Sequence, residues 1–336
     1  MKIYPFFIPH AGCPHRCRFC QQNSLSGVSR APAPEEVCVA LEKILPDKGE
    51  GEAAFFGGTF TLLASERQKA YLDQVAPFIR SGRLSGIRVS TRPDAISREN
   101  AGLLKECGVT TVELGCQSFS PAVLSLVQRG HGPDAAAIAV PILREQGLKV
   151  GLQLMPGLPG GDRKEAVFSL RRALALNPDF LRIYPAVVLK GTELEQVWRK
   201  GDFQPLALET AIDVCADLLL DCLAVGIPVI RLGLQSTEEL DRGDLLLAGP
   251  YHPAFGQLVQ SRLWRRALDR EMALMGAAAI QVHPADLGNA VGHRRENLHY
   301  LQGRYPGFSL GVQRTLPRYC FRFGERVLSA YPAPAK

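Results

Sequence analysis

Residues 12–20 read GCPHRCRFC and place Cys13, Cys17 and Cys20 in a C-x3-C-x2-C spacing. An iron–sulfur cube contains four irons, and ordinary clusters give each iron one cysteine. Three thiolates in one short loop would leave one iron open to a ligand that is not protein. The loop therefore predicts a [4Fe–4S] cluster with one open iron.

Two other interpretations of the cysteines remain open, a zinc site and a loop without metal. Zinc sites pair cysteines and need a second pair further along the chain, and a two-cluster ferredoxin repeats its cysteine run. The remaining cysteines form no second C-x2-C: Cys38, Cys107, Cys116, Cys215, Cys222 and Cys320. We interpret His15 as a loop residue and not as a metal ligand. The cluster is the favoured interpretation.

The composition is typical of a soluble globular protein, with 336 residues, 46% hydrophobic and 21% charged. No apolar run approaches the roughly 20 residues that span a bilayer. The first residues, MKIYPFFIPH, lack a signal-peptide layout. Nine cysteines, an odd number without framework spacing, argue against a secreted disulfide protein. We therefore expect a cytoplasmic protein without a membrane partner.

The formal net charge is +6, a mild excess that is compatible with a nucleic-acid partner. The densest basic stretch is residues 293–295, with Arg262, Arg265 and Arg266 upstream. Arg294 and Arg295 are therefore candidates for binding an anionic substrate.

Strand-like runs alternate with helix-like runs up to about residue 200. The predicted strands are Ile3–Pro9, Ala53–Phe56, Ile87–Thr91, Thr111–Leu114, Val150–Leu154 and Phe180–Tyr184. The predicted helices are Pro34–Leu45, Ser65–Arg80, Arg98–Cys107, Pro121–Val127, Asp134–Gln146 and Arg163–Leu176. This alternation predicts a parallel α/β fold. Six units are too few to close a barrel, so we expect an incomplete parallel (β/α)6 barrel, that is, a partial TIM barrel.

The pattern changes near residue 205. We expect a long helix at Leu206–Leu223, a short strand at Val229–Leu232, a polar joint at Gln235–Asp244 and a basic helix at Ala254–Met275. Shorter elements are expected at Ala278–Val282, Leu298–Leu301, Phe308–Val312 and Tyr319–Phe323. We therefore expect a partial barrel over residues 1–204. Residues 205–336 would be a C-terminal α+β segment that covers the barrel mouth or binds substrate.

Polar and glycine-rich residues follow the predicted strands, at the end where parallel barrels place their active sites. Gly57 and Gly58 follow the second strand, where the lack of a Cβ lets a ligand approach the backbone. Glu113, in an apolar strand, needs a partner such as Arg129. The planar guanidinium of Arg129 also suits a carboxylate ligand. Tyr184 follows the sixth strand and is a candidate for radical handling, substrate contact or core packing.

A series of motifs follows the cysteine loop, in the order FFGGTFT, STRPD, VELGCQS, QRGH, MPGLPG and IYPAVVLKGTELEQVWRKGDF. Over residues 13 to about 203 the chain resembles the radical S-adenosylmethionine (SAM) enzymes. It closely resembles the radical SAM domain of the Elongator catalytic subunit, and more distantly the oxygen-independent coproporphyrinogen III oxidases. The resemblance implies reductive cleavage of SAM at a 4Fe-4S cluster to a 5′-deoxyadenosyl radical. It also implies a reductant such as flavodoxin or ferredoxin.

The resemblance assigns roles to individual residues. The cluster would be held by Cys13, Cys17 and Cys20. SAM would be bound by Gly57, Gly58, Thr59, Ser90, Gln117, Arg129 and Gln153. Elongator subunits carry glutamate where this chain has Ser90, so the ribose contact there departs from the pattern.

The substrate does not follow from the resemblance, because the C-terminal residues show no acetyltransferase pattern. RNA is the first expectation. A small metabolite or a tetrapyrrole is the enzymatic alternative. An iron–sulfur RNA-binding module without turnover is the non-enzymatic one.

Overall fold

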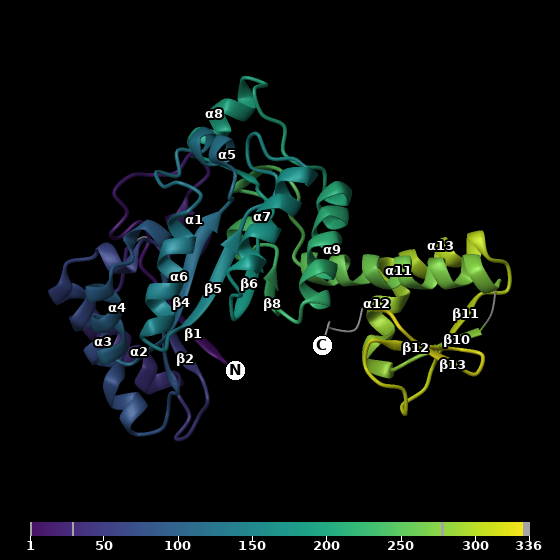
Figure 1. The fold of residues 1–336 in the computed structure, drawn as a ribbon, viewed down its shortest axis with the longest axis horizontal. Helices are drawn as coiled ribbons and strands as arrows, with labels where there is room; N and C mark the ends of the chain where they lie inside the picture. The colour runs from purple at the N-terminus through teal and green to yellow at the C-terminus, as the bar shows by residue number, and fades with distance from the viewer. Residues whose placement is uncertain (1, 29, 277–278, 332–336) are drawn as a thin grey trace. The chain divides into compact units, whose positions relative to one another are not determined.

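The computed structural model describes residues 2–28, 30–276 and 279–331, and among these six parallel strands lie side by side in chain order (Figure 1). Every neighbouring pair is parallel. The strands are β1 Ile3–Phe7, β2 Glu52–Phe56, β3 Gly86–Thr91, β4 Val109–Gln117, β5 Lys149–Leu154 and β6 Phe180–Ile183. The predicted partial barrel is confirmed, with each predicted strand present.

Helices connect the consecutive strands and lie along one face of the sheet (Figure 1), as right-handed crossovers require. They are α2 Pro34–Ile44, α3 Ser65–Arg80, α4 Arg98–Glu106, α5 Pro121–Leu126, α6 Ala135–Glu145 and α7 Arg163–Ala175. Side-chain caps fix several of their starts. Ser97 accepts a hydrogen bond from the backbone of Asn100 at the start of α4, and Asp162 does so from Glu165 at the start of α7. The six predicted helices are confirmed to within one or two residues.

The face of this sheet that packs against the helices is apolar, whereas the other face carries the buried charged side chains of Glu52, Arg88 and Glu113. Phe55 of β2 is fully buried, and its ring lies 5.4 Å from that of Phe60 and 5.3 Å from that of Tyr71 on α3. None of the helices in the described part of the chain is both long and apolar enough to cross a bilayer.

Contacts divide the chain into two compact units, residues 1–205 with 235–249, and residues 206–234 with 250–336. The first unit also contains α1 Gln22–Ser26, β7 Val188–Leu189, α8 Glu193–Arg199, α10 Glu238–Asp241, β9 Leu246–Ala248 and the 3-10 turns Phe60–Leu62 and Pro93–Ala95. Strand β9 pairs antiparallel with β7. The backbone NH of Lys190 also donates to the carbonyl of Leu245, at 2.9 Å. These bonds attach the segment 235–249 to the first unit.

The second unit combines helices with a small sheet in the order β11-β10-β12-β13. Its elements are α9 Leu208–Ala224, β8 Val229–Leu232, α11 Phe255–Met275, β10 Ala279–Val282, α12 Leu287–Val291, α13 Glu296–Arg304, β11 Ser309–Val312, β12 Cys320–Phe323, β13 Arg326–Ser329 and the 3-10 turns Pro284–Asp286 and His293–Arg295. Trp264 of α11 is fully buried, with its ring 6.3 Å from that of Phe321. The predicted elements are present, although Ala278 lies outside the described residues, and β13 was not predicted.

Candidate active site

The cysteine loop joins β1 to α1 and is fixed at both its backbone and its side chains. The amide of Cys13 donates to the carbonyl of His10 at 3.1 Å, and that of Cys20 to the carbonyl of Cys17 at 3.0 Å. Phe19 packs between two buried apolar clusters, one around Val123 and one around Val188. The loop is therefore built as a shaped turn that is anchored in the apolar interior of the first unit.

The three thiols of this loop lie close together. Cys17 is buried, while Cys13 and Cys20 are half-buried. Burial, together with the charges of Cys17 and Cys13, raises the pKa of the Cys20 thiol to about 12. Among the described residues no three His, Cys, Asp or Glu side chains surround a single ion site. A cube takes one thiolate per iron, so it does not require such a site.

The glycine segment after β2 packs directly on the cysteine loop. Gly58 has a φ of +63°, and a Cβ placed there would lie 2.2 Å from the carbonyl oxygen of Ala11. The amide of Thr59 donates to that same oxygen at 2.7 Å, and its hydroxyl lies 3.3 Å from the sulfur of Cys13. A side chain at Gly58 is therefore excluded, and the two loops form one backbone-lined cradle.

Gln22, which the sequence analysis did not single out, joins the two loops. Its side-chain oxygen accepts hydrogen bonds from the amides of His10 and Gly58, each at 2.7 Å. The backbone amide of Gln22 donates to the ring nitrogen Nε2 of His10 at 3.2 Å. The only sequence signal for Gln22 is its position two residues after the third cysteine of the loop.

Arg129 brings the fourth strand's loop to the cysteines. It is buried, and its Nη1 donates to the sulfur of Cys17 at 3.3 Å while its Nη2 donates to the carbonyl of Gly115 at 2.6 Å. Its Nε is buried and has no hydrogen-bond partner among the described residues. A buried, unsatisfied guanidinium nitrogen is costly, so this side chain retains a donor for an acceptor that the described part of the chain does not provide.

Gln117 and Gln153 lie together at the ends of β4 and β5. The side-chain amide of Gln153 donates to the side-chain oxygen of Gln117 at 3.2 Å. Gln117 has a φ of +69°, and the β4–β5 register shifts between Gly115 and Gln117. Strained backbone of this kind is held where a side chain must be aimed at a ligand.

His15 also holds the loops together, as its interpretation as a loop residue requires. Its Nε2 lies 3.2 Å from the carbonyl oxygen of Arg129 and 3.1 Å from Nη1 of Arg92. Arg92 is in turn held by both carboxylate oxygens of Asp94, at 2.9 and 2.7 Å. Gly130 leaves room for the ring, because a Cβ there would lie 2.2 Å from it.

The predicted pairing of Glu113 with Arg129 is wrong. Glu113 instead binds Arg88 on the neighbouring strand, at 2.6 Å, and Arg182 on β6, at 3.0 Å. Arg88 also binds Glu52 on β2, at 2.7 Å. The charges of Glu113 are thus satisfied inside the sheet, and Arg129 is left to face the cysteine loop.

The remaining predicted residues are Ser90, Tyr184, Arg294 and Arg295. Ser90 is half-buried, and no hydrogen bond from its side chain to the other predicted site residues is present in the described structure. The hydroxyl of Tyr184 accepts a hydrogen bond from Arg182 at 2.9 Å. Arg294 and Arg295 are exposed in the second unit. The structure thus brings together the cysteines, the glycine cradle, Arg129 and the two glutamines.

These residues fit a cluster with an amino-acid ligand. The charges of Cys13 and Cys17 act on Cys20, the glycine segment packs its backbone against the cysteine loop, and the Nε of Arg129, which has no hydrogen-bond partner among the described residues, is suited to a carboxylate. The family model for the radical SAM superfamily matches residues 7–173, and that for the Radical_SAM C-terminal domain matches residues 178–265. The chain belongs to the radical SAM superfamily. It is an enzyme of this superfamily, with a 4Fe-4S cluster and SAM as cofactors, and it requires a reductant.

Similar proteins support the resemblance to Elongator. A tRNA uridine(34) acetyltransferase of Methanocaldococcus infernus is 32% identical over 195 residues, which are 52% of this chain and 36% of that protein. The structure of the archaeal Elp3 of Methanocaldococcus infernus has a TM-score of 0.62 and 25% identity, and covers 79% of this chain and 63% of that one. The coproporphyrinogen III oxidase of Escherichia coli has a TM-score of 0.51 at 21% identity, covering 66% of this chain and 52% of that one, which shows a shared fold. The chain thus spans about a third of the acetyltransferase that it matches.

Proposed function

We propose that this radical SAM enzyme acts on RNA, with tRNA as the first candidate. The observation that carries the proposal is the joint sequence and structural similarity to a tRNA-modifying acetyltransferase and to archaeal Elp3. Acetyl transfer is not part of the proposal, because the similarity to the acetyltransferase covers only 36% of that protein.

Each residue of the cluster has a proposed task. Cys13, Cys17 and Cys20 hold the cluster, which with SAM supplies a 5′-deoxyadenosyl radical after one-electron reduction. The backbone at Gly57–Thr59 orients the amino group of SAM. Arg129 holds its carboxylate through Nε, for which the described residues supply no hydrogen-bond partner.

The two glutamines and Ser90 complete the proposed SAM site. Gln117 and Gln153 already lie in hydrogen-bond contact, so one orients the other toward the sugar and methionine groups. Ser90 shares a strand face with Arg88, because alternate residues of a strand point the same way. Tyr184, whose hydroxyl is held by Arg182, is the proposed substrate contact or radical-handling group.

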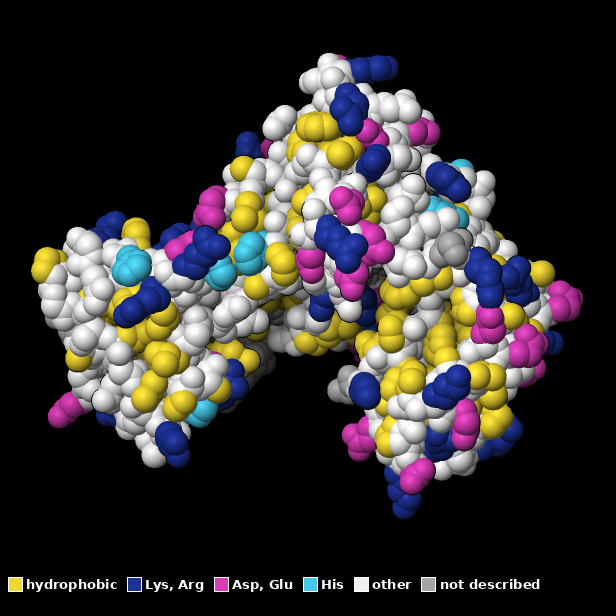
Figure 2. All heavy atoms as spheres, turned by 180° about the vertical axis from the view of Figure 1, so that it is seen from behind, with side chains coloured by type: hydrophobic (Ala, Val, Ile, Leu, Met, Phe, Trp, Pro, Cys, Tyr) yellow, Lys and Arg dark blue, Asp and Glu magenta, His cyan; other side chains and the backbone are white. Residues whose placement is uncertain are grey.

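The face of the molecule drawn in Figure 2 does not by itself mark an RNA-binding surface. Figure 2 shows Lys and Arg side chains interspersed with Asp and Glu side chains, without one large basic field. This agrees with the modest net charge of +6. RNA recognition on such a surface would depend on a few placed cations, and the C-terminal unit is the proposed place for them.

The test is anaerobic reconstitution with iron and sulfide, reduction, and quantitation of 5′-deoxyadenosine with and without tRNA. We expect a brown protein that cleaves SAM, faster with tRNA, and a modified nucleoside after digestion of that tRNA. Cys17→Ala should abolish both cluster and cleavage. Cys107→Ala, a half-buried cysteine outside the loop, is the matched control and should retain both.

Three results would contradict parts of the proposal. A cluster without SAM cleavage would favour an RNA-binding module without turnover. Cleavage that tRNA neither stimulates nor couples to a product would favour a small metabolite or a tetrapyrrole. A colourless protein with stoichiometric zinc would exclude the cluster.

A further inference from the structure

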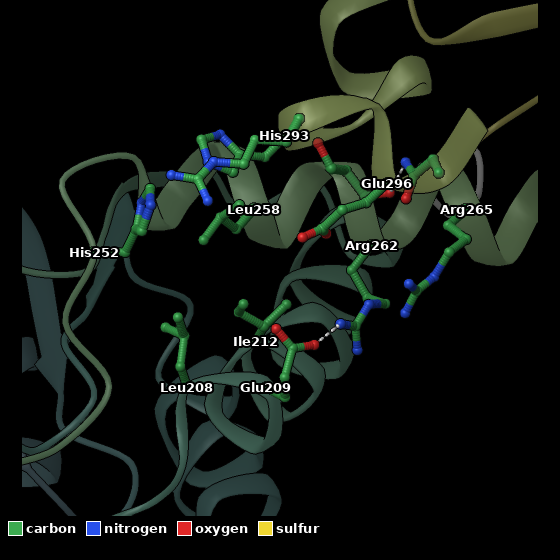
Figure 3. Close-up of a pocket in the computed structure, with 12 residues that line it drawn as sticks. Leu208, Glu209, Ile212, His252, Leu258, Arg262, Arg265, His293 and Glu296 are labelled. Atoms are coloured by element: carbon green, nitrogen blue, oxygen red, sulfur yellow. Dashed lines mark hydrogen bonds and ion pairs between the residues drawn. The ribbon is translucent and has the colours of Figure 1, made fainter. Parts of the chain in front are cut away.

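A pocket of about 250 Å³ lies within the second unit, between α9, α11 and the turn at 292–297. Figure 3 shows Leu208, Glu209 and Ile212 on one side of it and His293 and Glu296 on the other. None of its lining residues belongs to the radical SAM site described above. The pocket is slightly smaller than the roughly 300–1,000 Å³ of typical small-molecule sites, so it fits a chemical group or a small ligand.

The positive charges of the pocket are not all neutralised. Arg262 is buried and binds Glu209, at 2.5 Å, and Asp213. Arg265 and Arg294 also line the pocket, and among the described residues no carboxylate lies within ion-pair distance of either. Arg265 stacks instead on a tyrosine ring, 5.1 Å from its centroid. Neither guanidinium group therefore has an ion-pair partner among the described residues, although Asp213 and Glu209 act on Arg265 at longer range.

Two histidines add further donors beside these arginines. The rings of His252 and His293 meet edge to face, with centroids 5.1 Å apart, and both line the pocket. Burial and the charges of His293 and Arg294 lower the pKa of His252, against an opposing effect of Glu296. Apart from Glu209, which Arg262 neutralises, Glu296 supplies the carboxylate of this lining. The cations and potential cations of the pocket outnumber its free carboxylates.

The turn that carries Arg294 is strained. Arg294 and Arg295 both have left-handed backbone, with φ of +48° and +65°. This conformation costs about 1–2 kcal/mol for each non-glycine residue. Gly292 precedes them, and a Cβ there would lie 2.9 Å from Asn297. Such strain is typical of ligand clamps. Arg294 lines the pocket whereas Arg295 does not.

An unpartnered hydroxyl completes the site. Ser261 lines the pocket, is buried, and its Oγ has no hydrogen-bond partner in the described structure. A buried hydroxyl without a partner costs free energy. A ligand oxygen that accepts its hydrogen bond would remove this cost.

We propose that this pocket binds the phosphate group of a nucleotide or polynucleotide. The planar forks of Arg265 and Arg294 match phosphate oxygens, and the hydroxyl of Ser261 supplies a further donor. Leu208, Ile212 and Leu258 form an apolar wall suited to the attached sugar. The inference goes beyond the proposed function and does not depend on SAM cleavage.

The test measures binding of inorganic phosphate to the full chain by calorimetry, followed by competition. Arg265→Gln and Arg294→Asn each remove one guanidinium, and asparagine tolerates the left-handed backbone. Arg270→Gln, an exposed arginine on the same helix that binds Glu271, is the matched control. Circular dichroism verifies folding, and Arg294→Asn, in an exposed turn, is the variant least able to disturb the core.

We expect saturable phosphate binding that weakens about tenfold or more in both pocket variants and is unchanged in Arg270→Gln. Displacement of phosphate by AMP would identify a free nucleotide as the source. Displacement only by a short RNA without terminal phosphates would identify the polynucleotide backbone. Absence of saturable binding, or phosphate binding by both pocket variants as tight as that of the native chain, would overturn the inference. Failure of SAM cleavage would leave these measurements unaffected, so the two proposals fail independently.

Discussion

Arg129 donates a hydrogen bond from Nη1 to the sulfur of Cys17, at 3.3 Å, across 112 positions of the sequence. The same guanidinium binds the carbonyl of Gly115, and in the described structure its Nε has no hydrogen-bond partner. One side chain therefore connects the end of β4 to the cysteine loop and retains a donor for a ligand. This dual role makes Arg129 the most informative position outside the cysteines.

Replacement of Arg129 should separate SAM binding from cluster assembly. Arg129→Gln should weaken SAM affinity about 10- to 100-fold, the effect of losing a charged hydrogen bond, and Arg129→Lys should be intermediate because it keeps charge without the fork. The iron content of both variants should equal that of the native protein, since the three cysteine thiols are unchanged. Equilibrium SAM binding to reconstituted protein is the measurement, with the exposed Arg98→Gln as control. Unchanged SAM affinity would restrict Arg129 to a structural role.

A methyl group at Gly58 should disrupt the cradle, whereas one at Gly82 should not. Both glycines have positive φ, +63° and +73°, so both alanine variants carry backbone strain of about 1–2 kcal/mol. Only at Gly58 does the new Cβ meet backbone, 2.2 Å from the oxygen of Ala11, and at Gly82 it meets open space. We expect bound iron to fall in Gly58→Ala alone. Equal iron content in the two variants would contradict the packing of the two loops.

Removal of the charge on Glu113 should destabilise the sheet. Glu113→Gln leaves Arg88 and Arg182 with one fewer carboxylate in a buried setting. Breaking a buried ion pair costs about 3–5 kcal/mol. Urea unfolding followed by circular dichroism should show this loss. A change below about 1 kcal/mol would mean that solvent reaches the pair and screens it.

Stability should fall at acid pH in part through Glu52. Burial alone would raise the pKa of Glu52, but hydrogen bonds from Thr110 and Thr111 and the charge of Arg88 outweigh it, and the pKa lies below its ordinary value of 4.5. As the pH falls, Glu52 therefore takes up a proton in the unfolded chain at a higher pH than in the folded chain. The contribution of Glu52 is fully present above about pH 4.5 and is lost as the pH falls through the lower folded pKa.

The check on Glu52 is a comparison of pH profiles. Glu52→Gln should show a shallower loss of melting temperature over this acid range than the native chain, because it has no proton to take up there. Parallel profiles for the two proteins would assign the acid sensitivity to other carboxylates.

Local pattern was sufficient to predict the first unit's main elements. Helix Ser65–Arg80 and the strand that ends at Phe56 were predicted at those positions, because apolar periodicity and flanking glycine or proline set them locally. The cysteine loop and the Gly57-Gly58 turn were found because both are short motifs with chemical meaning. Strand β13 was missed because its four residues, Arg326–Ser329, are mostly exposed and lack an apolar run.

The pairing of side chains could not be predicted from local sequence pattern in the same way. The sequence analysis named Arg129 as a partner for Glu113, whereas the structure pairs Glu113 with Arg88 and Arg182. The choice depends on strand register across the sheet, with Ser90 of β3 opposite Glu113, and on the layer in which each side chain lies. Gln22 and His15 act through loop conformation, which no periodicity encodes.

The return of residues 235–249 to the first unit has a consequence for how this chain can be rearranged. The polypeptide passes between the two units three times, after residues 205, 234 and 249. A single cut, whether by a protease or by recombination between genes, cannot release either unit intact. A cut near residue 205 would remove β9 from its pairing with β7. Exchange of the second unit between relatives therefore requires two replaced segments, 206–234 and 250–336, around a retained insert.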